Sequence, residues 1–203
     1  TSKNVMNYPF TKSCIQFFAQ REVDAEQFAG DLSSYLMRNS EQVDFAMLNL
    51  LDSHDTVRFL TWCGGDKRLL RMAVLLLFSY VGMPCIYYGS EIGMEGGGDP
   101  DCRRTFDWNR KNWDQDLFRF YQQVIALRKS EKALQYGTIR MYAKEGVVYL
   151  IRDCRGSRLV TMLNNTDTEK SVSLQEDYEV LLCTGEMEKN VLRPFSGCIC
   201  RLV

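Results

Sequence analysis

The apolar run Phe45-Ala-Met-Leu-Asn-Leu-Leu51 is followed at once by the polar stretch Asp52-Ser-His-Asp-Thr-Val-Arg58. A compact apolar run between polar neighbours is typical of a strand buried on both faces, as in a parallel sheet covered by helices. In such folds the loops at the carboxyl ends of the strands build the binding and catalytic sites. The sequence therefore predicts a parallel strand over 45–51 and a functional loop directly after it.

Alternating strands and helices are expected on both sides of this strand. Further strands are predicted at Val5–Asn7 and Pro84–Tyr88, and the second runs into a glycine-rich loop at Gly89–Pro100. Asp24 is well placed as a helix N-cap, with Gln27 positioned to complete a capping box. The expected helices lie at Phe10–Phe18, after Asp24, at Lys67–Ser79 and at Asp114–Arg128. Buried strands alternating with helices predict part of a parallel α/β sheet.

The pattern changes near Gly137, after which only strands are predicted. They lie at Thr138–Ala143, Val147–Arg152, Leu159–Leu163, Lys170–Leu174, Glu179–Leu182 and Cys198–Val203. Short strands at this spacing are typical of a small antiparallel β-sandwich. We therefore expect two domains, residues 1–135 and 136–203. A carbohydrate-binding module is the alternative for the second, but without an evident aromatic stripe a structural domain is preferred.

Composition excludes several classes of partner. The chain has 25 basic and 26 acidic residues and a formal net charge of -1, which gives no electrostatic case for nucleic acid or anionic lipid. The longest apolar run, Met72–Phe78, is far too short to cross a bilayer and is better explained as the core side of a helix. The sequence therefore predicts a globular protein with neither nucleic acid nor membrane as a partner.

The eight cysteines do not indicate a metal site. The chain has one histidine and no Cys-X-X-Cys pair, whereas zinc sites use clustered cysteine and histidine ligands. We expect no metal and no cofactor. Disulfide scaffolds are usually much shorter, so free, buried thiols in a reducing compartment are expected, and with them a cytoplasmic location. Cys198 and Cys200 should share one face of a strand, where they would rarely bridge each other.

Polar and aromatic side chains follow two strands that are consecutive along the chain. His54 and Asp55 follow the first strand, Tyr87-Tyr88-Gly-Ser-Glu91 follows the second, and the next loop carries Asp99 and Arg103. Both strand ends are expected on one side of the sheet. This mixture of side chains suits the binding of a sugar, since charged groups form hydrogen bonds with hydroxyls and aromatic faces pack on pyranose rings. The alternative is that His54 and Asp55 only bond to backbone groups at a strand end.

Four stretches carry a resemblance to a known family. They are Val5-Met-Asn-Tyr-Pro-Phe10, Asn49–Arg58, Gly82-Met-Pro-Cys-Ile-Tyr-Tyr-Gly-Ser-Glu-Ile-Gly93 and Gly97-Gly-Asp-Pro-Asp-Cys-Arg103. The chain resembles the α-amylase family of glycoside hydrolases, most closely its neopullulanase, cyclomaltodextrinase and maltogenic amylase branch. The resemblance implies the last strands and helices of a (β/α)8 barrel, followed by an antiparallel sandwich.

The resemblance also implies roles for single residues. Asp55 matches the carboxylate that stabilises the oxocarbenium-like transition state, and His54 matches its neighbour that bonds the same sugar. Asp99 and Arg103 match residues that hold the next glucose toward the non-reducing side. Tyr8 matches an aromatic near the acceptor subsites. The implied substrates are maltooligosaccharides, cyclodextrins or related α-glucans cleaved at α-1,4 bonds, with α-1,6 bonds left open.

Two catalytic groups of a retaining glycosidase are not found in the sequence. Such enzymes need a nucleophile and an acid/base carboxyl, which in this family follow the fourth and fifth strands. The resemblance implies that this chain begins at the sixth strand. Asp52 is expected to serve as a strand-end hydrogen-bonding residue and Glu91 to orient its loop. We therefore expect an inactive, self-associating chain that needs the upstream barrel half. The alternative is a non-catalytic carbohydrate-binding or interaction protein.

Overall fold

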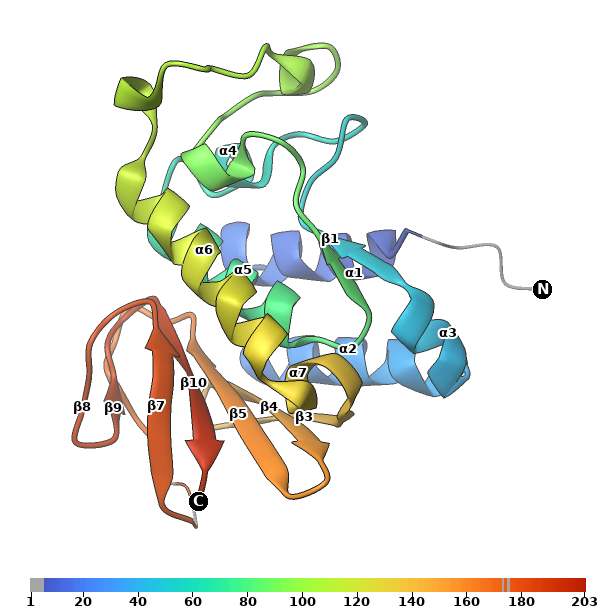
Figure 1. Cartoon of the computed structure of the whole chain (residues 1–203), viewed down its shortest axis with the longest axis vertical. Helices are drawn as coiled ribbons and strands as arrows, with labels where there is room; N and C mark the ends of the chain where they lie inside the picture. The colour runs from blue at the N-terminus through green and yellow to red at the C-terminus, as the bar shows by residue number, and fades with distance from the viewer. Residues whose placement is uncertain (1–5, 173, 175) are drawn as a thin grey trace.

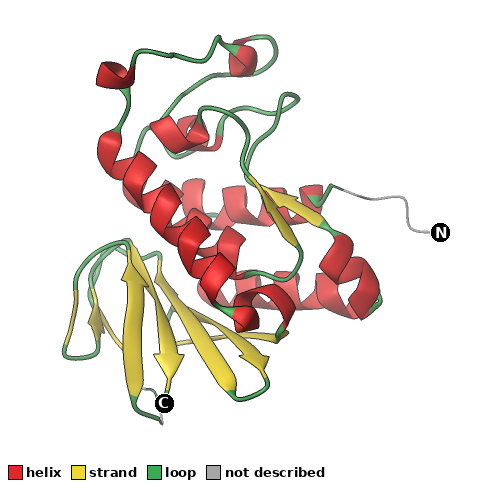
Figure 2. Cartoon of the chain, viewed as in Figure 1, coloured by secondary structure: helices red, strands yellow, loops and turns green. Residues whose placement is uncertain are grey.

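The computed structural model describes residues 6–172, 174 and 176–203. Helices gather in the N-terminal part, and antiparallel strands form the C-terminal part (Figures 1 and 2). The helices are α1 (Tyr8–Cys14), α2 (Ala25–Arg38), α3 (Glu41–Ala46), α4 (Phe59–Trp62), α5 (Lys67–Ser79), α6 (Gln115–Ser130) and α7 (Lys132–Tyr136). The strands are β1 (Leu48–Leu50), β2 (Met83–Cys85), β3 (Thr138–Lys144), β4 (Val147–Cys154), β5 (Ser157–Asn164), β6 (Lys170–Ser171), β7 (Tyr178–Cys183), β8 (Met187–Glu188), β9 (Val191–Leu192) and β10 (Ser196–Leu202).

The parallel strands are shorter than predicted. Helix α3 occupies 41–46, so the expected strand at 45–51 is reduced to β1, and the second strand ends at Cys85, before the tyrosines. The backbone N–H groups of Val43 and Asp44 donate to Ser40 O, so local hydrogen bonds close a helical turn before the chain extends. Strands β1 and β2 pair in parallel, and Met6 forms a parallel bridge to Leu48. Of the strand predicted at 5–7, Val5 lies outside the described residues.

The helices follow their predicted starts closely. Helix α1 continues into a π-helical turn at Ile15–Ala19, α5 has the predicted bounds, and Asp114 caps α6. Asp24 accepts from Gln27 N at 2.8 Å as expected. The prediction of a capping box is wrong, because the Gln27 side chain donates at 2.8 Å to Asp31, one turn further along the helix.

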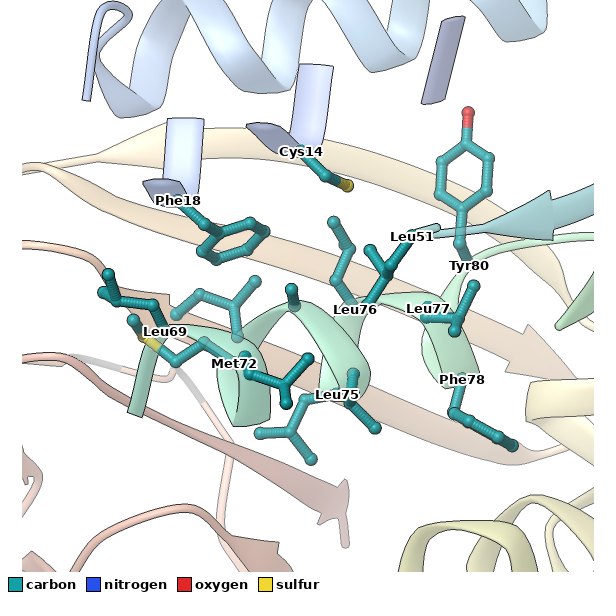
Figure 3. Packing of buried hydrophobic residues seen from close by; sticks show 14 of the residues in the cluster. Cys14, Phe18, Leu51, Leu69, Met72, Leu75, Leu76, Leu77, Phe78 and Tyr80 are labelled. Atoms are coloured by element: carbon teal, nitrogen blue, oxygen red, sulfur yellow. The ribbon is translucent and has the colours of Figure 1, made fainter. Parts of the chain in front are cut away.

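Helix α5 lies at the centre of the main hydrophobic core. Its residues Met72–Ser79 are all buried, and the surrounding cluster includes Cys14, Phe18 and Tyr80 (Figure 3). A helix that is apolar on every side needs partners on every side, and it packs against the π-helical turn and against β5 and β10. Among the described residues, no helix is long and apolar enough to span a membrane.

The C-terminal strands form two antiparallel sheets. The larger has the order β3-β4-β5-β10-β7 and the smaller β6-β9-β8. The six predicted strands are present with shifted ends, while the two-residue strands β8 and β9 were not predicted. Strand β6 ends at Ser171, earlier than the predicted end at Leu174, and Ser173 lies outside the described residues. The larger sheet packs one face on α5 and turns the other toward a second core shared with the small sheet.

Two arginines converge on the C-terminal end of α5, and one of them, the buried Arg152, joins this end to the larger sheet. Arg152 in β4 donates to the carbonyl oxygens of Ser79 at 2.7 Å, Leu134 at 3.0 Å, Gly137 at 2.8 Å and Thr138 at 3.1 Å. Burial lowers the pKa of Arg152 to about 9, so the guanidinium stays charged at neutral pH. Arg128 in α6 donates to the carbonyl oxygen of Phe78 in the last turn of α5 and to that of Gly82 just after the helix, both at 2.6 Å. The carbonyls at the C-terminus of α5 therefore receive positive charge, as the helix dipole favours.

Candidate active site

The loops after β1 and β2 rise from the same end of the parallel strands (Figure 1). Asp52, directly after β1, accepts from Phe59 N at 3.0 Å and from Ser90 Oγ at 3.1 Å, which ties the first loop to the second. Its carboxyl group is buried, and burial raises its pKa. Asp52 is therefore a strand-end hydrogen-bonding residue, as the sequence predicted.

His54 and Asp55 form the tip of the first loop. Ser53 N donates to Thr56 Oγ1 at 2.9 Å, and Asp55 N donates to Ser53 Oγ at 3.2 Å, so the turn is held by its own backbone and hydroxyl groups. The side chains of His54 and Asp55 are 59% and 56% exposed and meet each other, with Nε2 and Oδ2 3.1 Å apart. Within the described chain neither side chain bonds to a backbone group. This argues against a purely strand-capping role.

Arg103 connects the two loops at this tip. Its Nε lies 3.0 Å from Asp99 Oδ1, and its Nη2 lies 3.5 Å from Asp55 Oδ1. The same Nε donates to the carbonyl oxygen of His54 at 2.9 Å. The structure therefore brings four of the five predicted site residues into one exposed cluster of two carboxylates, an imidazole and a guanidinium. These groups can together donate to and accept from several hydroxyls of a sugar ring.

Tyr8 does not belong to this cluster. Its hydroxyl lies 3.8 Å from Met6 Sδ, and its half-exposed ring lines an open hollow with Thr56 and Trp62. The hollow reaches Thr56, next to Asp55, so Tyr8 lies beside the loop without contacting the charged groups. Its role at acceptor subsites stays a prediction. The loop-orienting role expected for Glu91 stays a prediction, and its Oε2 is buried without a hydrogen-bond partner among the described residues.

The sequence prediction missed Arg58 as the residue that holds the two loops together. It is fully buried, its Nε donates to Cys102 O at 3.0 Å, and its backbone N–H donates to Gly96 O at 3.0 Å. The rings of Tyr87 and Tyr88 lie over the guanidinium, with centroids 4.0 and 4.7 Å away. Cys102 Sγ in turn donates to His54 O at 3.2 Å.

Close backbone packing also fixes the second loop. Gly96 N donates to Thr61 Oγ1 at 2.8 Å, and a Cβ at Gly96 would approach Asp101 O to 2.7 Å. Asp101 accepts from Gly97 N at 2.6 Å and pairs with Arg104, and both contacts lower its pKa. The segment carrying Asp99 and Arg103 is thus held at both ends. Among the residues that the structure describes, no group of three or more His, Cys, Asp or Glu side chains is arranged to hold a metal ion.

Known proteins are similar to this chain in sequence and in fold. Residues 1–113 match the family described as alpha amylase, catalytic domain. Neopullulanase 2 of Thermoactinomyces vulgaris is 43% identical over 97% of this chain and 36% of its own length. A cyclomaltodextrinase of Bacillus sp is 46% identical over 79% of this chain and 30% of its own length.

Solved structures agree with the sequence matches. A cyclic alpha-maltosyl-(1-->6)-maltose hydrolase from Arthrobacter globiformis, in complex with that sugar, aligns with a TM-score of 0.88 at 28% identity over 99% of this chain and 45% of its own. A cyclomaltodextrinase aligns with a TM-score of 0.84 at 36% identity over 96% of this chain and 36% of its own. The chain spans about a third of the length of the curated relatives named above.

Proposed function

This chain belongs to the α-amylase family of glycoside hydrolases, and on that premise we propose that it is the C-terminal segment of a retaining α-glucan hydrolase. The proposed substrates are maltooligosaccharides and cyclodextrins cleaved at α-1,4 bonds, with α-1,6 bonds as the second linkage. The names of the relatives, cyclomaltodextrinase and neopullulanase, support this substrate class. In this proposal residues 1–135 form the end of the catalytic barrel and residues 136–203 its structural sandwich.

The observation that carries the proposal is the cluster around Arg103. Asp55 would stabilise positive charge at the anomeric carbon and bond ring hydroxyls, and His54 would bond the same sugar. Asp99 and Arg103 would hold the next glucose on the non-reducing side. Because Arg103 contacts both carboxylates and the His54 carbonyl, the two proposed sugar positions share one set of contacts.

The nucleophile and the acid/base are proposed to come from an upstream barrel half. Retaining glycosidases place two carboxyl groups roughly 5–5.5 Å apart. Asp52 does not suit either role, since both of its oxygens accept hydrogen bonds inside the protein. The described part of the parallel sheet has Met6, β1 and β2 in that order, and no strand there pairs with the outer edge of Met6 or β2. Five further strands would close the barrel.

Surfaces beside these edges support a missing partner. An open hollow next to β2 is lined mainly by apolar side chains, among them Ile86, Phe118 and Ile125, and also by Glu91 with its unpartnered buried oxygen. Met83 on the edge strand is 48% exposed. We propose the upstream barrel half as the occupant, with self-association as the result when it is absent. We also propose a cytoplasmic location, since all eight cysteines are free and a Bacillus subtilis relative is named an intracellular maltogenic amylase.

A chimera tests the proposed function. Residues 1–203 would replace the matching segment of neopullulanase 2, and hydrolysis of cyclodextrin and maltotriose would be measured. We expect an active chimera in which Asp55→Asn lowers kcat about a hundredfold or more, since charge stabilisation of the transition state is lost. Asp116→Asn is the matched control, because that carboxylate is exposed on α6 and pairs only with Arg119.

The outcomes separate the competing functions. An active chimera unaffected by Asp55→Asn would contradict the assignment of Asp55. A folded but inactive chimera, together with maltoheptaose binding by the 203-residue chain, would favour a non-catalytic carbohydrate-binding protein. The isolated chain itself should not hydrolyse either sugar, and Asp55-dependent activity of the pure chain would refute the need for an upstream half.

A further inference from the structure

Four sulfur atoms gather between the two antiparallel sheets. Cys198 Sγ lies 3.2 Å from Met187 Sδ and 3.7 Å from Cys200 Sγ. Cys183 is directly opposite Cys198 in the register of β7 and β10. These residues belong to the second core, in which Cys198 and Cys200 are fully buried and Cys183 is half-buried. The proposed α-glucan hydrolysis uses none of them.

The register places Cys183 and Cys198 at the spacing of a cross-strand disulfide. Thr184 N donates to Gly197 O at 2.9 Å, which makes Thr184 and Gly197 the hydrogen-bonded neighbours of this pair. Hydrogen-bonded and non-hydrogen-bonded pairs alternate along antiparallel strands, so Cys183 and Cys198 form a non-hydrogen-bonded pair with Cα atoms about 4.5 Å apart. Disulfides accept Cα separations of about 4.4–6.8 Å. The two residues can therefore be linked with the strands left in place.

Cys183 lies where a small thiol-reactive molecule can reach it from solvent. Strand β7 is the outer strand of the five-stranded sheet, and its Cys183 is half-buried. A hydrogen bond with Cys198 lowers the pKa of Cys183, and thiolates are the attacking species in thiol–disulfide exchange. The other neighbouring pair, Cys14 and Cys63, lies inside the main core, where burial raises the pKa of both thiols.

We propose that Cys183 and Cys198 are a thiol modification site whose two sulfurs form a reversible disulfide with each other on reaction with low-molecular-weight disulfides of the glutathione type. The Cys183 thiolate attacks one sulfur of the reagent, the reagent S–S bond breaks, and one thiolate leaves. The Cys198 sulfur then attacks Cys183 in the mixed disulfide and releases the second reagent thiolate. The two cysteines are oxidised by two electrons, one reagent disulfide is reduced to two thiols, and the leaving thiolates take up the two cysteine protons. The new bond closes the loop that contains β8 and β9.

The test uses the whole 203-residue chain and oxidised glutathione. After native incubation, remaining thiols are alkylated, and tryptic peptides are analysed by mass spectrometry without reduction. Cleavage after Lys189 separates Cys183 from Cys198, so the link would appear as a two-chain peptide that reduction splits. The expected product is a Cys183–Cys198 link, with Cys200 alkylated on the same peptide and the intact mass lower by two hydrogen atoms.

Variants and an unfolded sample make the outcome decisive. Cys183→Ser should abolish the link, whereas Cys200→Ser and Cys154→Ser, a half-buried thiol elsewhere in the sheet, should leave it intact. In concentrated urea the selectivity for this pair should disappear, because the strand register creates it. A stable glutathione adduct on Cys183, a Cys14–Cys63 link formed in preference, or equal selectivity in urea would each overturn the proposal. None of these readouts depends on glycosidase activity.

Discussion

Replacing Arg152 with methionine should strongly destabilise the protein. The substitution keeps an unbranched apolar stem while removing a guanidinium that reaches Ser79, Leu134, Gly137 and Thr138. These carbonyls come from the ends of α5 and α7 and from the start of β3. The change therefore removes the group that joins three segments at one buried point.

The size of the effect follows from the hydrogen bonds. Each bond is worth about 1 kcal/mol net, and a buried acceptor left without a donor costs about 1–3 kcal/mol. Four lost bonds would therefore cost about 4 kcal/mol or more. The variant also avoids the desolvation cost of a buried cation without a carboxylate partner, which opposes this loss. We therefore expect a net decrease of about 3 kcal/mol in the free energy of unfolding. That is a large part of the 5–15 kcal/mol typical of folded domains.

Urea unfolding followed by circular dichroism at low protein concentration would measure the loss. Arg155→Met is the matched control, because Arg155 is exposed in the turn between β4 and β5 and should change stability by less than about 0.5 kcal/mol. Arg152→Lys, which keeps the charge but has fewer donors, should fall between the two. Wild-type stability in Arg152→Met would refute the reasoning and show that desolvation of the cation balances its four bonds.

Four further predictions concern the site and the open sheet edges. Asp52→Ala should lower the free energy of unfolding by about 2 kcal/mol, because Phe59 N and Ser90 Oγ lose their acceptor. Since the folded pKa of Asp52 is raised, its contribution is complete below the unfolded pKa and is lost as pH rises through the folded pKa. Asp52→Asn should therefore become more stable relative to wild type as pH rises over that window. Urea titrations at several pH values would measure the stability difference, and a difference that changes in the other direction would contradict the prediction. In the chimera, Arg103→Ala should raise KM for maltooligosaccharides more than it lowers kcat, because Arg103 is proposed to hold the sugar beside the reacting one; an effect on kcat alone would argue against this. The isolated chain should self-associate through its uncovered edges, and a monodisperse, cooperatively melting monomer in light scattering and calorimetry would contradict that expectation.

Local signals decided which parts of the fold were predictable. Helix α5 was predicted with its observed bounds because Asp66 caps it and its apolar run is long. The strand at 45–51 was overextended because the sequence pattern of a short apolar run does not separate helix from strand, and α3 takes its first residues. Strands β8 and β9 have two residues each, too few for an alternating pattern, and they depend on pairing, β8 with β9 and β9 with β6.

In the candidate site, too, residues identified by their sequence neighbours were predicted, whereas a contact between distant parts of the chain was not. His54 and Asp55 could be placed at a strand end from their immediate neighbours, and Asp99 and Arg103 from the following loop. Arg58 could not be recognised as the connection between the two loops, because its acceptor, the carbonyl oxygen of Cys102, lies 44 residues away in the sequence. This hydrogen bond forms only when the second loop folds back onto the first. A charged residue inside a motif can thus stabilise the loop conformation instead of binding a ligand. Only the burial of the guanidinium distinguishes these two roles. By that criterion the exposed Arg103 is free to take the proposed role of binding a sugar, whereas the buried Arg58 fixes the backbone beside it through Cys102 O.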